Sequence, residues 1–176
     1  MTDRTRGRKA GDRTRRAIEQ WELARPDLDI GILRLRTRIS LLGTYAATDN
    51  QRIARAHGIR GDDLRVLFAL RRLGPPFRLR PTELFRTLLV SSGTMTRLVD
   101  RLAVAGMVER VPDPADGRSA LVALTARGLE VVDAAVEAAV EHSPISAAVR
   151  TLGAGDRAAL EELLARLLSE LEAAGR

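Results

Sequence analysis

Residues 91–102 read SSGTMTRLVDRL, a stretch whose side chains could bind nucleic acid. Ser91, Ser92 and Gly93 would stand at a helix N-terminus, where unpaired backbone N–H groups form a ready site for phosphate. The threonines offer hydroxyl and methyl groups, and the guanidinium of Arg97 can donate two hydrogen bonds to a guanine. The stretch therefore indicates a helix that docks its first turn on phosphate and reads bases from one face.

Helical spacing divides this stretch into two faces. The apolar residues fall on one stripe, which we expect to face the core: Met95, Leu98, Val99 and Leu102. The polar residues fall on the opposite side: Thr96, Arg97, Asp100 and Arg101. An ordinary capped helix with a solvated face is the alternative for this stretch taken alone.

A second candidate site is the turn in DPADGRSA, residues 113–120. Its prolines and Gly117 shape a turn, and Asp113 and Asp116 offer carboxylates that could orient Arg118. A single arginine at a loop tip suits a narrow, electronegative minor groove. The alternative is a turn without a binding role.

The elements around these two motifs follow a recognisable order. We predict helices over residues 14–24, 29–57 and 81–90, a helix from an Asp62 or Asp63 cap to Leu73, and the helix from Ser91. Two short strands, around MVERV and RSALVALT, follow with PDPADG as their turn. Helix, helix, hairpin is the order of a winged helix-turn-helix. The fold class is therefore mainly α with a small β-hairpin.

The C-terminal region is predicted to form further helices. Thr125 caps one that runs to about Val140, Pro144 interrupts it, and Asp156 opens the last. The last helix carries a strongly periodic leucine stripe that must be buried: Leu160, Leu163, Leu164, Leu167, Leu168 and Leu171. A homodimer that pairs the terminal helices of two subunits would cover it, and a monomeric helical cap is the alternative.

Composition excludes several classes of protein. The 176 residues contain no cysteine, no convincing catalytic arrangement and only His57 and His142 as histidines, so we expect no enzyme, no cofactor and no metal site. No apolar run is long enough to cross a membrane, and we expect a cytoplasmic protein. Net charge is +6, and residues 1–16 carry seven basic side chains against two acidic ones, which predicts a disordered basic tail over residues 1–13.

Residues 81–128 resemble the DNA-binding half of MarR-family transcriptional regulators, through SSGTMTRLVDRL and DPADGR together. The resemblance implies a homodimeric winged-helix regulator that binds double-stranded DNA with a pseudo-palindromic sequence. It also implies major-groove contacts from the helix at Ser91 and a minor-groove contact from Arg118. We assign DNA binding to eleven residues: Pro81, Thr82, Ser91, Ser92, Gly93, Thr94, Thr96, Arg97, Arg101, Asp116 and Arg118.

The N-terminal WELARPDLD is similar to the branch of that family that contains PecS and urate-responsive regulators. This resemblance implies an effector site that includes Trp21 and Arg110. Arg65 stands where that branch has an aspartate, and Leu98 where it has an arginine, which argues against urate. We expect a phenolic or other small anionic ligand near Trp21, Arg65 and Arg110, with a packing anchor as the alternative role of Trp21.

These expectations combine into one functional prediction. Residues 14–57 and 128–176 would serve dimerisation, with the ligand on the N-terminal side, and residues 58–127 would bind DNA. The protein would be a ligand-responsive repressor of transcription. The alternative is a winged-helix module that binds another protein and no operator, although Arg97, Arg118 and the basic tail argue against it.

Overall fold

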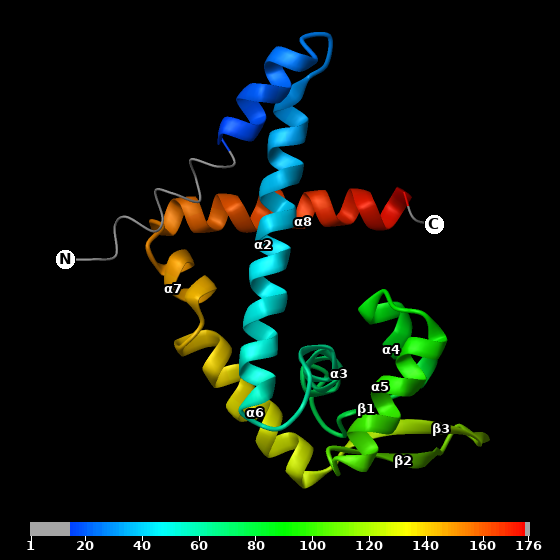
Figure 1. The fold of residues 1–176 in the computed structure, drawn as a ribbon. Helices are drawn as coiled ribbons and strands as arrows, with labels where there is room; N and C mark the ends of the chain where they lie inside the picture. Colours follow the sequence, from blue (N-terminus) through cyan, green and yellow to red (C-terminus); the bar gives the residue numbers. More distant parts are fainter. Residues whose placement is uncertain (1–14, 175–176) are drawn as a thin grey trace. The chain divides into compact units, whose positions relative to one another are not determined.

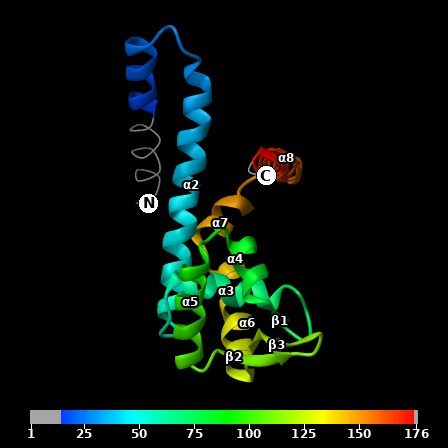
Figure 2. The ribbon, with the colours of Figure 1, turned by 90° about the vertical axis from the view of Figure 1, so that its right-hand side faces the viewer.

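A computed structural model describes residues 15–174, except for the side chains at positions 117 and 118. The described chain forms two compact units that divide between Ala47 and Thr48. The predicted basic tail over residues 1–13 lies outside the described residues. Figures 1 and 2 show the elements in two views.

The first unit contains two helical segments. Residues 15–24 are helical, and α2 (Ile30–Arg55) begins in this unit and continues into the second. Asp29 accepts a hydrogen bond from the backbone N–H of Gly31 at 2.9 Å, which satisfies one of the free donors in the first turn of α2. Glu22 and Arg34 form an ion pair between the two segments. Both predicted helices are confirmed.

The second unit has the winged helix-turn-helix order, and this prediction is confirmed. Its first part comprises α3 (Gly61–Arg71), α4 (Pro81–Leu88) and α5 (Ser92–Val104), followed by β2 (Val108–Asp113) and β3 (Asp116–Leu124). Helix α3 packs against α5 and against α6 (Ala126–Glu141), and α4 packs against α5 (Figure 1). The core contains Leu64, Leu67 and Leu70 of α3 together with residues of α4, α5, the strands and α6.

The sheet has one strand more than predicted. The short strand β1 (Arg78–Leu79) pairs with β3 in antiparallel register, Arg78 opposite Ala123 and Leu79 opposite Val122. The strand order is therefore β1-β3-β2. The sequence pattern does not indicate β1, because two residues are too few to produce an alternating pattern.

The C-terminal part contains α6 (Ala126–Glu141), α7 (Pro144–Arg150) and α8 (Ala154–Ala174). Thr125 caps α6, as predicted, by accepting a hydrogen bond from the backbone N–H of Gly128 at 3.0 Å. Helix α7 was not predicted, and α8 begins two residues before Asp156. Ser143 caps α7, with its hydroxyl accepting from Ile145 and Ser146.

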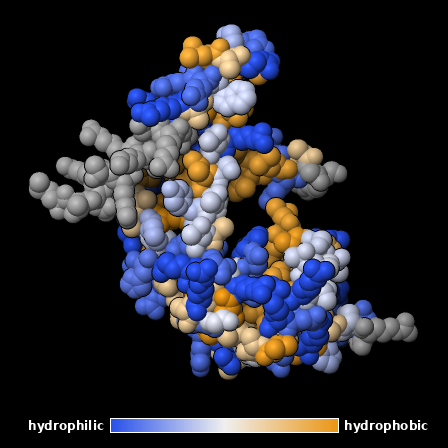
Figure 3. All heavy atoms as spheres, in the orientation of Figure 1, coloured by the Kyte–Doolittle hydropathy of each residue, from blue (hydrophilic) through white to orange (hydrophobic). Residues whose placement is uncertain are grey.

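One local prediction is wrong. The N-cap of α3 is Arg60, not Asp62 or Asp63; Asp63 lies in the first turn, and its carboxylate accepts from the backbone N–H of Arg60. The six leucines of the α8 stripe are 39–64% exposed in the single chain, so their burial by a second subunit stays a prediction. Apolar side chains are visible where α8 runs in Figure 3.

Candidate nucleic-acid interface

The first turn of α5 is built by local hydrogen bonds from serine and threonine. Ser91 is the N-cap, and its hydroxyl oxygen accepts from the backbone N–H of Thr94 at 3.2 Å. The hydroxyl groups of Ser91 and Thr94 lie 2.9 Å apart. All four residues from Ser91 to Thr94 are exposed, so the unpaired N–H groups of this turn face an accessible surface. An anion can approach it.

The two predicted faces of α5 are confirmed. Its apolar stripe is buried against the core: Met95, Leu98, Val99 and Leu102. Thr96 and Arg97 are exposed, and the Thr96 hydroxyl donates to the carbonyl oxygen of Ser92 at 3.1 Å. Arg97 forms no hydrogen bond or ion pair with any residue in the described part of the chain. Its guanidinium is therefore available to an external partner.

Arg101 has a different environment from Arg97. Its guanidinium holds the carboxylate of Asp63 on α3, with Nη2 2.6 Å from Oδ1, and this hydrogen bond raises the pKa of Arg101. Asp63 is only 3% exposed. We predicted that Arg101 belongs to the DNA-facing side of α5, whereas its main described partner lies within the protein. A contact of Arg101 with DNA stays a prediction.

The start of α4 lies next to the hairpin. Pro81 occupies the first helical position, where a missing N–H costs nothing, and Thr82 is exposed beside it. Arg80 is the N-cap, and its backbone N–H donates to Glu83 Oε2 at 3.0 Å. The side chain of Arg80 extends to the hairpin and forms an ion pair with Asp113, Nε to Oδ2 at 2.6 Å.

The hairpin tip is organised around Asp113, and an orientation of Arg118 by Asp113 or Asp116 stays a prediction. Asp113 is 5% exposed and accepts hydrogen bonds from the Ala115 backbone N–H at 2.9 Å, the Ser119 hydroxyl at 3.3 Å and Arg80. The Ala115 N–H and the Arg80 guanidinium lower the pKa of Asp113. Asp116 is exposed at the tip, and the Arg118 side chain lies outside the described residues. Arg80 is therefore the described partner of Asp113, and sequence reasoning missed it.

Comparison with known proteins assigns this arrangement to a family. Residues 57–119 match the model of the MarR family. The HTH-type transcriptional regulator PecS of Dickeya dadantii is 30% identical over 128 residues, which cover 71% of this chain and 75% of PecS. The chain belongs to the MarR family. Its predicted resemblance to that family of DNA-binding transcriptional regulators is thereby confirmed.

Solved structures of MarR-family proteins share the fold. A mutant MarR from E. coli, crystallised in complex with operator DNA, is 29% identical and superposes with a TM-score of 0.66 over 78% of this chain and 96% of that one. AbsC, a MarR-family regulator from Streptomyces coelicolor, gives a TM-score of 0.68 at 20% identity, over 83% of this chain and 97% of AbsC. The second likeness concerns the fold alone.

The three predicted effector residues have separate environments. Trp21 lies in the first unit and is 51% exposed. Arg65 on α3 donates to the carbonyl oxygen of Leu88 at 2.9 Å and so caps the end of α4. Arg110 on β2 pairs with Asp100 of α5 at 2.7 Å. Arg65 thus contacts the end of α4 and Arg110 contacts α5. The role of both arginines in ligand binding stays a prediction.

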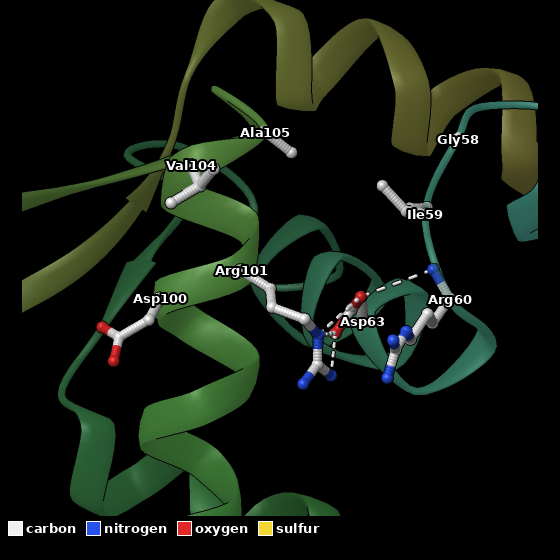
Figure 4. Close-up of a pocket in the computed structure, with 8 residues that line it drawn as sticks. All are labelled: Gly58, Ile59, Arg60, Asp63, Asp100, Arg101, Val104 and Ala105. Carbon is white, nitrogen blue, oxygen red and sulfur yellow. Dashed lines mark hydrogen bonds and ion pairs between the residues drawn. The ribbon is translucent and has the colours of Figure 1, made fainter.

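A pocket of about 400 Å³ lies beside the Asp63–Arg101 pair. Ile59, Val104 and Ala105 supply its apolar wall, and the backbone N–H of Arg60 and the guanidinium of Arg101 both donate to Asp63 (Figure 4). None of the three predicted effector residues lines it. The pocket offers a small molecule an apolar wall together with charged groups of both signs, two arginines and two aspartates.

Searches for other chemistry give negative results within residues 15–174. No group of three or more His, Asp or Glu side chains that could hold a metal ion occurs among the described residues. None of the helices described is long and apolar enough to span a membrane.

Proposed function

We propose that this MarR-family protein is a repressor that binds a pseudo-palindromic operator as a homodimer and is released by a small ligand. The observation that carries the proposal is the division of α5 into a buried apolar stripe and an exposed face with Thr96 and the unpartnered Arg97. The exposed serines and Gly93 at its N-terminus suit phosphate, and Arg97 suits a guanine.

The other DNA-binding assignments complete this interface. Pro81 and Thr82 would approach the DNA backbone at the start of α4, and Asp116 and Arg118 would stand at the minor groove. NicR from Pseudomonas putida, which is 35% identical over 110 residues, is named a transcriptional repressor, and this supports repression as the function. In this proposal residues 58–127 bind DNA, and the helices of residues 14–57 and 128–176 serve dimerisation.

The exposed leucines of α8 support the homodimer. A stripe of six leucines, each at least 39% exposed, would leave a large apolar surface in water. A second copy would cover it, and a dimer would match the symmetry of a pseudo-palindromic site. Sedimentation of the wild-type chain should therefore give a dimer. Leu163→Glu combined with Leu167→Glu should give monomers, whereas Leu73→Glu, at an exposed leucine outside α8, should leave the dimer intact.

The operator proposal is tested by fluorescence anisotropy with a duplex taken from upstream of the protein's own gene. We expect competitor DNA of unrelated sequence to displace the protein roughly a thousandfold less effectively than the operator. The affinity should fall as salt rises, because phosphate contacts release counterions. Equal affinity for all sequences would overturn the proposal and favour a module that binds another protein.

Ligand release is tested with small aromatic carboxylates such as benzoate and 4-hydroxybenzoate. A ligand that binds the free protein better than the DNA complex must weaken operator binding by the same factor. We expect a rise in melting temperature together with release of the duplex. Variants Trp21→Ala, Arg65→Ala and Arg110→Ala, measured beside Arg60→Ala, decide between the predicted effector residues and the pocket of Figure 4.

A further inference from the structure

Asp113 stands at the tip of a projecting hairpin, where a side chain is usually exposed, yet it is only 5% exposed. Figures 1 and 2 show the β2–β3 hairpin extending beyond the helices around it. A carboxylate that loses its water must be compensated by donors. Asp113 finds them in the Ala115 N–H, the Ser119 hydroxyl and the Arg80 guanidinium.

Two of these donors close the hairpin on itself. The register of β2 and β3 shifts between Pro112 and Asp113, so that Asp113 stands opposite Asp116 and only two residues connect the strands. The Ala115 N–H and the Ser119 hydroxyl both turn inward to the same carboxylate. These contacts fix the shape of the tip, but they do not fix where it stands relative to the helices.

The third donor comes from outside the hairpin. Arg80 is fixed to α4, because it is the N-cap of that helix and its backbone N–H is held by Glu83. Its Nε and Nη2 both lie 2.6 Å from Oδ2 of Asp113. Strand β1 ties the hairpin at Ala123 and Val122, near its base. The Arg80–Asp113 pair ties it at its tip, three residues along β2 from Arg110, which stands opposite Val122.

We infer that the Arg80–Asp113 pair positions the hairpin tip, and with it Arg118, for DNA held by α4 and α5. Both residues are positioning residues in this assignment, acting through Arg118. The inference rests on the proposed operator binding. The pair couples the start of α4 to the tip of the β2–β3 hairpin.

Asp113→Asn tests this coupling, because two explanations predict opposite signs. Removing one negative charge near DNA should strengthen binding if Asp113 acts only through its charge. If Asp113 positions the tip, operator affinity should fall, by roughly tenfold, which is the loss expected when one arginine contact is removed. Glu109→Gln is the matched control, since it removes an exposed carboxylate from the same strand. It should leave affinity unchanged or slightly raise it.

A double-mutant cycle with Arg118→Ala separates positioning from a general loss of folding. In the Asp113→Asn background, Arg118→Ala should cost little more, because the arginine is already misplaced. Arg80→Lys keeps one cation near Asp113 and should bind better than Arg80→Met. Melting temperatures of all variants, measured without DNA, show whether each one is folded.

Three results would overturn the inference. They are tighter operator binding by Asp113→Asn, behaviour equal to that of Glu109→Gln, and full additivity of Asp113→Asn with Arg118→Ala. Failure of the proposed function looks different, since the wild-type protein itself would then show no preference for the operator. Should Asp113→Asn not fold, a double-mutant cycle of Arg80→Met with Arg118→Ala decides the question, and full additivity of those two substitutions would overturn the inference.

Discussion

Arg101 of α5 grips Asp63 of α3 with two nitrogens of its guanidinium: Nη2 lies 2.6 Å from Oδ1, and Nε lies 3.2 and 3.3 Å from the two carboxylate oxygens. Asp63 also accepts from the backbone N–H of Arg60 at the start of α3. This pair holds the C-terminal half of α5, Ser91 caps its N-terminus, and the buried apolar stripe runs along the helix between them. The direction of the exposed face is therefore fixed at both ends.

Replacing Arg101 by Met should lower the free energy of unfolding by about 1–3 kcal/mol, because it leaves the buried Asp63 carboxylate without its cation. The expected loss is smaller than for a fully buried pair, since the Arg101 side chain is 38% exposed. Urea unfolding measures it. Arg110→Met breaks the exposed pair with Asp100 and should cost under about 1 kcal/mol. Equal losses in the two variants would contradict a special role for Asp63.

Arg97 offers a test of base reading. Arg97→Ala should weaken operator binding by about 1–3 kcal/mol and should relax the preference for one base pair in each half-site. Folding should be unaffected, since Arg97 is exposed and forms no hydrogen bond or ion pair with any residue in the described part of the chain. Anisotropy titrations with single base-pair substitutions provide the measurement. Arg157→Ala on α8 removes the same charge, and a similar loss of preference there would refute base reading by Arg97.

Gly93 separates stability from DNA binding in the same helix. A Cβ at this position meets no atom within 4 Å, and the residue lies within α5, so Gly93→Ala should keep or slightly raise the melting temperature. The added methyl group would nevertheless stand between the first turn and an approaching phosphate. We expect weaker binding to operator and non-operator DNA alike. Unchanged affinity would place the phosphate elsewhere.

What the sequence predicts well are features that repeat locally. The stripe from Met95 to Leu102, the helix start at Ser91 and the cap at Thr125 depend on spacing and residue type within one helix, and all are confirmed. The short elements β1 and α7 were missed, because two and seven residues hold too little periodicity.

Contacts between distant residues set the limit of prediction at the candidate site. The partner of Arg101 is 38 positions away, and that of Arg80 is 33 positions away. No local sequence pattern predicts either ion pair. The sequence therefore assigns Arg101 to the DNA-facing side of α5 and gives no role to Arg80. The N-cap of α3 was mispredicted for a related reason. Aspartate is a common N-cap residue, but Asp63 lies three residues after the actual N-cap, Arg60.

The lowered pKa of Asp113 predicts a pH dependence with a definite sign. The Ala115 N–H and the Arg80 guanidinium favour the charged form, so the folded protein binds this proton less tightly than the unfolded chain. The stabilisation is complete above the ordinary aspartate pKa of about 3.9 and is lost as the pH falls through the lower folded value. The stability difference between wild type and Asp113→Asn should therefore be constant near neutrality and shrink below about pH 4. A difference that grows in acid would contradict the assignment.

Gly128 joins the hairpin to α6 through a backbone approach that excludes any side chain. A Cβ at Gly128 would lie 1.9 Å from the carbonyl oxygen of Met107, the residue before β2. The neighbouring Thr125 cannot relax easily, since its backbone N–H donates to the same oxygen at 3.1 Å and its hydroxyl donates to Gly106 at 2.7 Å. Gly128→Ala must therefore push α6 away from the wing, and we expect a loss of about 2–4 kcal/mol in urea unfolding. Gly155→Ala in α8 is the control, because a Cβ there meets nothing within 4 Å and should stabilise the helix by about 0.5–1 kcal/mol. Equal effects of the two substitutions would show that α6 can shift without cost.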